Sequence, residues 1–123
     1  MKRILMVEDQ PDIRKLIRMT LEFEDYEVHE AEDGEQGMAR VAELRPDLVL
    51  LDVMLPGTMD GLEVCRRIRA DAALSRTPVI MVTARGMATD VEAGRAAGAD
   101  EYLFKPFSPH ELIETIERMT GAA

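Results

Sequence analysis

The residues of this chain with the clearest chemical capacity stand where short apolar runs end. Asp52 follows the run Leu-Val-Leu-Leu, Glu8 and Asp9 follow the first apolar run, and Thr83 and Lys105 end two later ones. An ionised carboxylate costs several kcal/mol to bury without a partner, so Asp52 requires solvent, a cation or a hydrogen-bond donor at the end of its run. These acids, the hydroxyl and the ammonium group are therefore the candidate functional residues.

The apolar runs predict the strands that position these groups. Residues 48–51 and Val53 are aliphatic. This indicates a strand buried on both faces, because a half-exposed strand would alternate apolar and polar positions. Pro56 and Gly57 indicate that this strand has ended. By the same criteria, the sequence predicts strands at 3–7, 26–30, 48–52, 79–82 and 101–104.

Helical spacing and capping signals predict helices between these strands and after the last one. Pro11 suits a first helical turn. Leu16 and Ile17 belong to an apolar stripe that we expect to be buried, with Arg14 on the exposed side. Capping-box spacing predicts three further helix starts, at Asp33 and Gln36, at Asp60 and Glu63, and at Ser108 and Glu111.

A helix predicted at 87–97 is the weakest of the set. Gly94 lies inside it, Gly98 follows it, and alanines supply most of its core face. Each interior glycine costs about 1 kcal/mol relative to alanine. We therefore expect this helix to shift or fray more easily than the others.

Five strands alternating with five helices predict an α/β fold with one parallel sheet and right-handed crossovers. In such sheets the functional crevice lies beyond the carboxyl ends of the strands, where the strand order reverses. All of the candidate residues named above stand at such ends. We therefore expect them to converge at one edge of the sheet.

The length, charge and cysteine content limit the classes of function. The 123 residues fit one domain spanning 1–123, and a net charge of -9 disfavours direct contact with nucleic-acid phosphates, which needs clustered Lys and Arg. The single cysteine, Cys65, excludes an internal disulfide and is expected to be a core residue in a reducing compartment. No stretch is long enough for a signal peptide or a membrane span, so we expect a cytoplasmic protein without membrane contact.

Four motifs stand in a specific order and spacing. They are the acidic pair Glu8-Asp9, Asp52 with Met-Leu-Pro-Gly and Met-Asp-Gly after it, Val-Thr-Ala at 82–84, and Ala-Gly-Ala-Asp-Glu-Tyr-Leu-Phe-Lys-Pro-Phe at 97–107. Together they resemble the receiver domain of two-component response regulators, of the CheY-like kind, over essentially the whole chain. The resemblance implies a doubly wound, flavodoxin-like sheet of five parallel strands in the order 2-1-3-4-5.

The resemblance also implies phosphoryl-transfer roles for four side chains. Asp52 matches the residue that accepts a phosphoryl group from a histidine kinase, and Lys105 matches the lysine that pairs with that group. Thr83 matches the hydroxyl that binds the acyl phosphate, and Tyr102 matches the switch aromatic that fills the space vacated by Thr83. The peptide between Lys105 and Pro106 is usually cis in this family. Such a domain assists its own phosphorylation and dephosphorylation and is not an enzyme with separate turnover.

The acidic residues match a metal site that holds Mg²⁺ or Mn²⁺ in the family. Its ligands would be Glu8, Asp9, Asp52 and the backbone carbonyl of Met54. If the first and third strands are neighbours, each close pair of carboxylates costs on the order of 4 kcal/mol at about 4 Å. A divalent cation removes this repulsion and can also take an oxygen of the phosphoryl group.

The resemblance implies two kinds of protein partner. A sensor histidine kinase or a phosphotransfer protein would donate the phosphoryl group, and a downstream protein target or an output domain would respond to it. We expect the output face to comprise the helix at 87–97, the strand at 101–104 and the last helix. The domain would be a monomer or a phosphorylation-dependent dimer, and it would not itself contact nucleic acid.

The turn after the third strand departs from the family pattern. Receivers commonly read Pro-x-Met-Asp-Gly there, whereas Thr58 makes this turn one residue longer. The extra residue lies past Met54, so we expect it to affect kinase contact or loop mobility more than metal binding. Met54 and Arg85 occupy the positions that flank the acyl phosphate, and an apolar Met54 predicts a long-lived phosphorylated state.

Other interpretations of the single residues remain open from the sequence. Asp52 and Thr83 could cap a turn and the next helix. Lys105 could be a surface lysine that lays its stem on apolar neighbours. Tyr102 could be a half-buried strand aromatic without a switching role.

Other functions also remain open for the whole chain. A haloacid-dehalogenase-like phosphatase uses a strand-end aspartate, but its general acid would stand where Met54 is. A flavodoxin-like cofactor module would bind phosphate after the first strand, where Glu8 and Asp9 would repel it. The chain could also be the receiver part of a longer DNA-binding transcriptional regulator.

Overall fold

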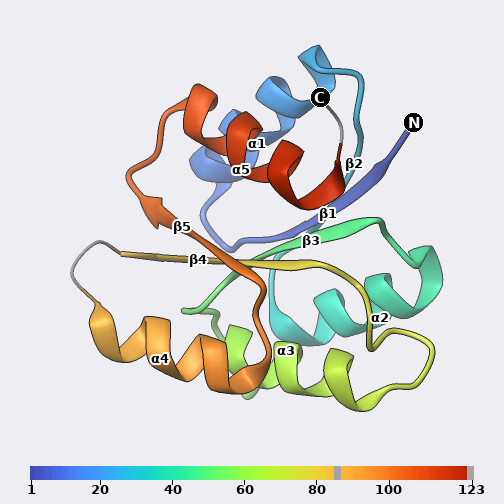
Figure 1. Cartoon of the computed structure of the whole chain (residues 1–123), viewed down its shortest axis with the longest axis vertical. Coiled ribbons are helices and arrows are strands. Elements are labelled where there is room, and N and C mark those ends of the chain that lie inside the picture. Colours follow the sequence, from blue (N-terminus) through green and yellow to red (C-terminus); the bar gives the residue numbers. More distant parts are fainter. Residues whose placement is uncertain (85–86, 122–123) are drawn as a thin grey trace.

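Five parallel strands form one sheet in the order β2-β1-β3-β4-β5, with helices on both faces (Figure 1). The computed structural model of the protein describes residues 1–84 and 87–121. The strands are β1 (Arg3–Val7), β2 (Glu27–Ala31), β3 (Leu48–Asp52), β4 (Val79–Ala84) and β5 (Glu101–Lys105). The helices are α1 (Pro11–Phe23), α2 (Gly34–Leu44), α3 (Gly61–Ala70), α4 (Ala88–Ala97) and α5 (Pro109–Thr120). The predicted fold class and strand order are confirmed. None of these helices is long and apolar enough to cross a membrane.

Alternate residues of the central strands face opposite sides of the sheet and form two separate cores. In β1, Leu5 and Val7 pack toward α2, α3 and α4, while Ile4 and Met6 pack toward α1 and α5 (Figure 1). All five residues of β3 are buried, as its aliphatic run predicts. Because both faces are covered, polar side chains of these strands reach solvent only near the strand ends.

β4 and β5 end later in the sequence than predicted, so both strands include a candidate residue. β4 ends at Ala84 and β5 at Lys105, and the register pairs Thr83 with Phe104 and Ala84 with Lys105. β2 begins at Glu27, one residue later than predicted. The longer ladder places Thr83 and Lys105 within paired strands, so both side chains project from the sheet rather than from loops.

Arg14 and Leu16 of α1 occupy the opposite environments from those that helical spacing predicts. Leu16 is 40% exposed, whereas the Arg14 side chain is only 13% exposed. The Arg14 guanidinium donates to the backbone carbonyl of Glu8 at 2.8 Å and pairs with Glu30 at 3.2 Å. The prediction for both residues was wrong, because partners at the ends of β1 and β2 hold the arginine against the sheet. Ile17 is buried as predicted.

The predicted capping residues start their helices, although only one capping box is complete. Ser108 and Glu111 make both bonds of the box and start α5. Asp33 and Asp60 each accept a backbone N–H three residues along the chain and start α2 and α3. The side chain at position 36 accepts instead from the N–H of Glu32, and the one at position 63 pairs with arginines of α3.

Cys65 lies in the core on the α3 side of the sheet, as predicted. Its side chain is fully buried, and burial raises the pKa of its thiol. A thiol with a raised pKa is a poor nucleophile at neutral pH. Cys65 is therefore a small core residue.

Candidate functional site

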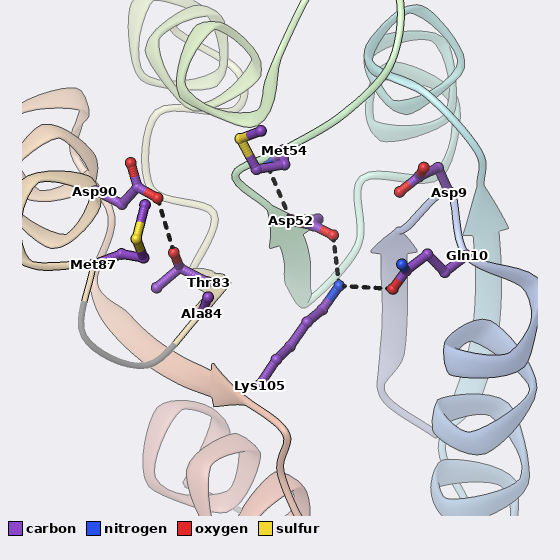
Figure 2. A pocket seen from close by; sticks show the side chains of 9 residues that line it. All are labelled: Asp9, Gln10, Asp52, Met54, Thr83, Ala84, Met87, Asp90 and Lys105. Atoms are coloured by element: carbon purple, nitrogen blue, oxygen red, sulfur yellow. Dashed lines mark hydrogen bonds and ion pairs between the residues drawn. The ribbon is translucent and has the colours of Figure 1, made fainter.

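The candidate residues lie together at the carboxyl edge of the sheet. Asp9, Asp52, Thr83 and Lys105 line a hollow of about 320 Å³ (Figure 2), and Glu8 is buried in contact with Lys105. The other residues that line the hollow are Gln10, Met54, Ala84, Met87 and Asp90. Segments from both halves of the chain thus contribute to one site, while the roles of these residues stay predictions.

Asp52 is the last residue of β3 and is 6% exposed. Its Oδ1 accepts the backbone N–H of Met54 at 2.9 Å, and its Oδ2 accepts a hydrogen bond from the Lys105 ammonium at 2.8 Å (Figure 2). The first bond is a turn cap, one of the alternatives open from the sequence, and the second shows that Asp52 does more than cap. A carboxylate offers about four lone-pair positions, so two bonds leave it able to take further partners.

The start of α3 fixes the backbone at Asp52. The N–H of Gly61 donates to the carbonyl of Val53 at 3.0 Å. A Cβ at Gly61 would lie 2.0 Å from the backbone oxygen of Asp52, closer than any side chain allows. Glycine at this position therefore lets α3 approach β3 and hold the aspartate in place.

Lys105 is an internal counter-ion rather than a surface lysine. Its Nζ lies 2.8 Å from Asp52 Oδ2 and 2.8 Å from Glu8 Oε1, and it donates to Gln10 Oε1 at 3.5 Å. Burial alone would lower the pKa of Lys105, but the bonds to Asp52 and Glu8 outweigh burial and leave the pKa above its usual value. The peptide that joins Lys105 to Pro106 is cis, as the resemblance implies.

Glu8 is the most deeply buried acid of the site, with a side chain that is 3% exposed. The pKa of Glu8 is raised from 4.5 to about 7, chiefly by burial and also by the nearby charge of Asp52, against the opposing bonds from Lys105 and the N–H of Gln10. Burial therefore disfavours the ionised form of Glu8 relative to a carboxyl in water. A positive charge at the site would favour its ionised form.

The three carboxylates fit a hard divalent cation. Glu8, Asp9 and Asp52 each present an oxygen, and these oxygens lie within 4.8 Å of one another. Two ligands on opposite sides of a magnesium ion stand about 4.2 Å apart, given Mg–O distances of about 2.1 Å. Small side-chain rotations would therefore bring the oxygens into coordination range. Asp9 is exposed, so water can complete the ligand set.

Thr83 and Tyr102 both bond to the first half of α4. The Thr83 hydroxyl donates to Asp90 Oδ2 at 3.2 Å (Figure 2), and the Tyr102 hydroxyl donates to the backbone carbonyl of Val91. Thr83 does not cap α4, because the N-cap residue is Met87 and it makes no side-chain cap bond. Two side chains of the sheet thus hold adjacent residues of the helix that the sequence predicts to be weak.

Gly94, which makes α4 a weak helix, has a packing function. A Cβ at Gly94 would lie 3.1 Å from both Cε1 and the hydroxyl of Tyr102. The ring of Tyr102 packs there against α4, and it stacks on Phe104 with ring centroids 6.4 Å apart. Tyr102 is half-buried, which agrees with the interpretation of Tyr102 as a half-buried strand aromatic. It is also hydrogen-bonded to α4.

The longer turn after β3 is fastened to the start of α2. Thr58 Oγ1 donates to Glu35 Oε1 at 2.7 Å, and this bond lowers the pKa of Glu35. A Cβ at Gly34 would lie 2.3 Å from the backbone oxygen of Met59, so the turn packs tightly on α2. The extra residue is thus bonded to α2 and does not line the hollow, while its effect on kinase contact stays a prediction.

Met54 lines the hollow and is 73% exposed as a whole residue. Its backbone N–H binds Asp52, while the role of its carbonyl as a metal ligand stays a prediction. Arg85, the other residue expected to flank the acyl phosphate, lies outside the described residues.

Sequence reasoning missed three residues that shape the site. Asp90 binds Thr83, Gln10 binds Lys105, and Arg14 holds the carbonyl of Glu8. The sequence carries only a weak signal for Gln10 and Asp90. Gln10 directly follows the candidate Asp9, and Asp90, in the first turn of the next helix, follows the candidate Thr83. Their contacts depend on how the elements pack, which periodicity does not describe.

The fold is that of a doubly wound α/β protein, with three carboxylates and a lysine gathered at the carboxyl edge of its parallel sheet. The particular family follows from comparison with known proteins. The model of the response regulator receiver domain matches residues 4–117, and the chain belongs to this family. The chain is therefore the receiver domain of a two-component response regulator, and such domains are regulators rather than enzymes with separate turnover.

Relatives with known names support the assignment. The chain is 47% identical over 121 residues to the transcriptional regulatory protein ResD of Bacillus subtilis, a match that covers 98% of this chain and 49% of ResD. It is 44% identical over 123 residues to the phosphate regulon transcriptional regulatory protein PhoB of Pseudomonas aeruginosa, covering 98% of this chain and 53% of PhoB. The chain thus spans about half the length of these relatives.

Solved structures show the same fold. The chemotaxis response regulator CheY4 of Vibrio cholerae matches with a TM-score of 0.91 at 34% identity, covering 97% of this chain and 98% of that one. The receiver domain of the sensor histidine kinase PA1611 from Pseudomonas aeruginosa matches with a TM-score of 0.90 at 36% identity, covering 98% of each chain. The PA1611 domain is described with a magnesium ion coordinated in its active site cleft.

Proposed function

We propose that this receiver accepts a phosphoryl group on Asp52 in a two-component His-Asp phosphorelay. The proposal is carried by the setting of the Asp52 carboxylate, which ends a buried strand, lies 2.8 Å from the Lys105 ammonium and shares its hollow with Asp9. Membership of the receiver family supports the same assignment.

Asp52 acts as the nucleophile. One of its oxygens attacks the phosphorus of a phosphohistidine, so that a P–O bond forms and the P–N bond breaks. The electron pair of the broken bond stays on the imidazole, which takes up a proton from solvent. The N–H of Met54 holds the carboxylate in a fixed orientation, so little reorganisation precedes the attack.

Lys105 places a positive charge beside Asp52, where the phosphoryl group would bind. Its raised pKa keeps the ammonium protonated at neutral pH. As the phosphoryl group arrives, negative charge moves from the Asp52 oxygen to the phosphoryl oxygens. The ammonium can follow that charge, because it already lies within hydrogen-bond distance of Asp52.

Glu8, Asp9 and Asp52, with the backbone carbonyl of Met54, would hold Mg²⁺ or Mn²⁺. The bound cation would offset the charges of the carboxylates and of the phosphoryl oxygens. The 4.8 Å grouping of the carboxylate oxygens supports this part of the proposal. The burial of Glu8 also supports it, because a cation at the site would favour the ionised form of a carboxyl whose pKa burial raises.

Thr83 and Tyr102 would convert phosphorylation into a change of the surface formed by α4, β5 and α5. Thr83 lines the hollow, so its hydroxyl can reach a phosphoryl oxygen and donate to it. Tyr102 binds α4 through Val91 and packs on Gly94, so a shift of Thr83 or α4 changes its packing. The affinity of this surface for a downstream partner would then rise or fall.

The complete protein would pair this receiver with an output domain. The relatives ResD and PhoB are named as transcriptional regulatory proteins, MtrA is named as a DNA-binding response regulator, and each extends well beyond the matched region. We place DNA binding in that further part, because a receiver with a net charge of -9 repels nucleic acid. The phosphodonor would be a sensor histidine kinase or a phosphotransfer protein in the cytoplasm, and phosphorylation would set the balance of monomer and dimer.

Acetyl phosphate tests the proposal without a kinase. With magnesium, intact-mass spectrometry should show one phosphoryl group on the wild-type chain and none on the Asp52→Asn variant. Asp60→Asn is the matched control, because asparagine also caps helices well and Asp60 starts α3 outside the hollow. It should be labelled like the wild type. Equal labelling of Asp52→Asn, or labelling that a chelator leaves unchanged, would contradict the proposal.

A further inference from the structure

Asp90 is a carboxylate in the hollow to which the proposed function gives no role. It belongs to the first turn of α4 and lines the same hollow as Asp52 and Lys105 (Figure 2). Its Oδ2 accepts the hydroxyl of Thr83 at 3.2 Å. Thr83 is 3% exposed, so this bond joins a buried strand residue to the helix.

We propose that Asp90 is a charge-sensitive latch, which holds α4 against the sheet in the unphosphorylated protein and releases it when Asp52 is phosphorylated. This inference rests on the proposed function, since it names how that same site is regulated. Asp90 acts through Thr83 and the phosphoryl charge, and it is therefore a positioning residue.

The hydroxyl of Thr83 cannot serve both partners. A threonine hydroxyl has a single proton to donate. In this structure Asp90 receives it. A phosphoryl group on Asp52 would compete for the same proton with oxygens that carry more negative charge, so its capture of Thr83 breaks the bond to Asp90.

Charge acts in the same direction as the lost bond. An aspartyl phosphate carries a charge of about -1.5 to -2 at neutral pH, whereas the Asp52 carboxylate that it replaces carries a single negative charge, so the site gains roughly half to one negative charge. Among the described residues that line the hollow, Lys105 is the one cation, and Asp52 and Glu8 already bind it. No cation among the residues that the structure describes pairs with Asp90, so repulsion from the phosphoryl group would drive the first turn of α4 outward.

The fold confines this movement to the first half of α4. The N-cap residue Met87 makes no side-chain cap bond, and only Gly94 and Ala97 of the helix are buried. The far end is held firmly by Arg69, whose guanidinium donates to the carbonyl of Gly98 at 2.9 Å and pairs with Asp100 at 2.7 Å.

Release at Asp90 reaches Tyr102 directly. The next residue along the helix, Val91, accepts the Tyr102 hydroxyl through its carbonyl. An outward shift of Asp90 therefore strains or breaks the tyrosine bond as well. The latch thus links the charge at Asp52 to the aromatic side chain on β5 through two adjacent residues of one helical turn.

A simpler role for Asp90 predicts different behaviour. An acidic residue in the first turn of a helix stabilises that helix through its dipole. If Asp90 does only this, its removal weakens α4 and leaves the affinity for a phosphoryl mimic unchanged. If Asp90 is a latch, removal of its charge raises that affinity, because Thr83 and α4 are then held less strongly.

Beryllofluoride with magnesium is the probe, and backbone amide resonances of α4 in NMR spectra report its binding midpoint. The Asp90→Asn variant should bind about tenfold more tightly than the wild type, since a like charge is removed and the Thr83 hydroxyl is left with a neutral amide oxygen as its acceptor. Glu92→Gln is the matched control, because it makes the same change of charge at an exposed position of α4 outside the lining of the hollow. It should bind like the wild type, and so should Asp90→Glu, which keeps the charge.

The outcomes separate the latch from the proposed function. If the wild type shows no response to beryllofluoride, the proposed function fails. If the wild type responds and Asp90→Asn binds equally or more weakly, the latch is overturned and the proposed function stands. If Glu92→Gln also binds about tenfold more tightly, charge anywhere on α4 produces the effect and the latch is again overturned. Far-UV circular dichroism of each variant shows whether it is folded.

Discussion

The buried carboxylate of Glu8 should make the metal-free protein less stable at pH 8 than at pH 5. Burial, with the charge of Asp52, raises the pKa of Glu8 from 4.5 to about 7 in the folded state. Between these values the unfolded chain has lost this proton while the folded chain keeps it, so rising pH favours unfolding. A pKa difference of roughly 2.5, at about 1.36 kcal/mol for each factor of ten in proton affinity, gives a total loss of about 3 kcal/mol, most of which falls between pH 5 and pH 8.

Urea denaturation at several pH values measures this loss. Far-UV circular dichroism is the suitable signal, because the chain has no tryptophan. The Glu8→Gln variant is the matched control, since its amide does not titrate and groups common to both proteins cancel in the difference. The lowered pKa values of Glu27, Glu35 and Glu63 affect stability below about pH 4.5, outside the window. If the wild type and Glu8→Gln show the same dependence between pH 5 and pH 8, the burial argument for Glu8 is refuted.

Three further changes test other parts of the structure. Magnesium at a hundredfold excess over its dissociation constant should stabilise the wild type by about 2.7 kcal/mol against urea, and Asp9→Asn should lose most of this gain; an equal gain in Asp9→Asn would exclude Asp9 as a ligand. Gly61→Ala should cost about 2 kcal/mol or more in the same assay, because the new Cβ would lie 2.0 Å from a backbone oxygen. Gly37→Ala should cost less, since its Cβ would meet Val7 methyl groups at 3.1 and 3.2 Å, and a reversed order would contradict the clash. Met54→Asn should shorten the lifetime of the phosphorylated state, measured as loss of label after gel filtration, because a polar side chain can orient the attacking water; a wild-type lifetime of seconds would contradict the shielding by Met54.

The sheet was predictable because its strands carry strong local signals. The run at 48–51 has no polar residue before Asp52, and burial on both faces of a parallel sheet requires such a run. The helix starts at Asp33, Asp60 and Ser108 were predictable for a similar reason, since capping depends on residues within one turn.

The environment of α1 was not predictable in the same way. Helical spacing places Arg14 and Leu16 on two faces of the helix, but it does not reveal which charges lie across from them. Glu30 on β2 and the carbonyl of Glu8 bind Arg14 against the sheet. Long-range ion pairs of this kind decide burial only after the strands have paired.

The candidate site was predictable in its members but only partly in its bonds. Strand ends in a parallel sheet meet at one edge, so the gathering of Asp9, Asp52 and Lys105 follows from the element order. The bond between Thr83 and Asp90 depends on how α4 packs on β4, and neither residue signals the other in the sequence.

Reductive trapping tests the role of Asp52 most directly. Borohydride converts an aspartyl phosphate to homoserine, and tandem mass spectrometry of the digested chain then locates the converted residue. After treatment with acetyl phosphate and magnesium, we predict homoserine at position 52 and at no other position. Conversion at Asp9 or another acid in place of Asp52, or no conversion at all, would contradict the assignment of Asp52 as the phosphoryl acceptor.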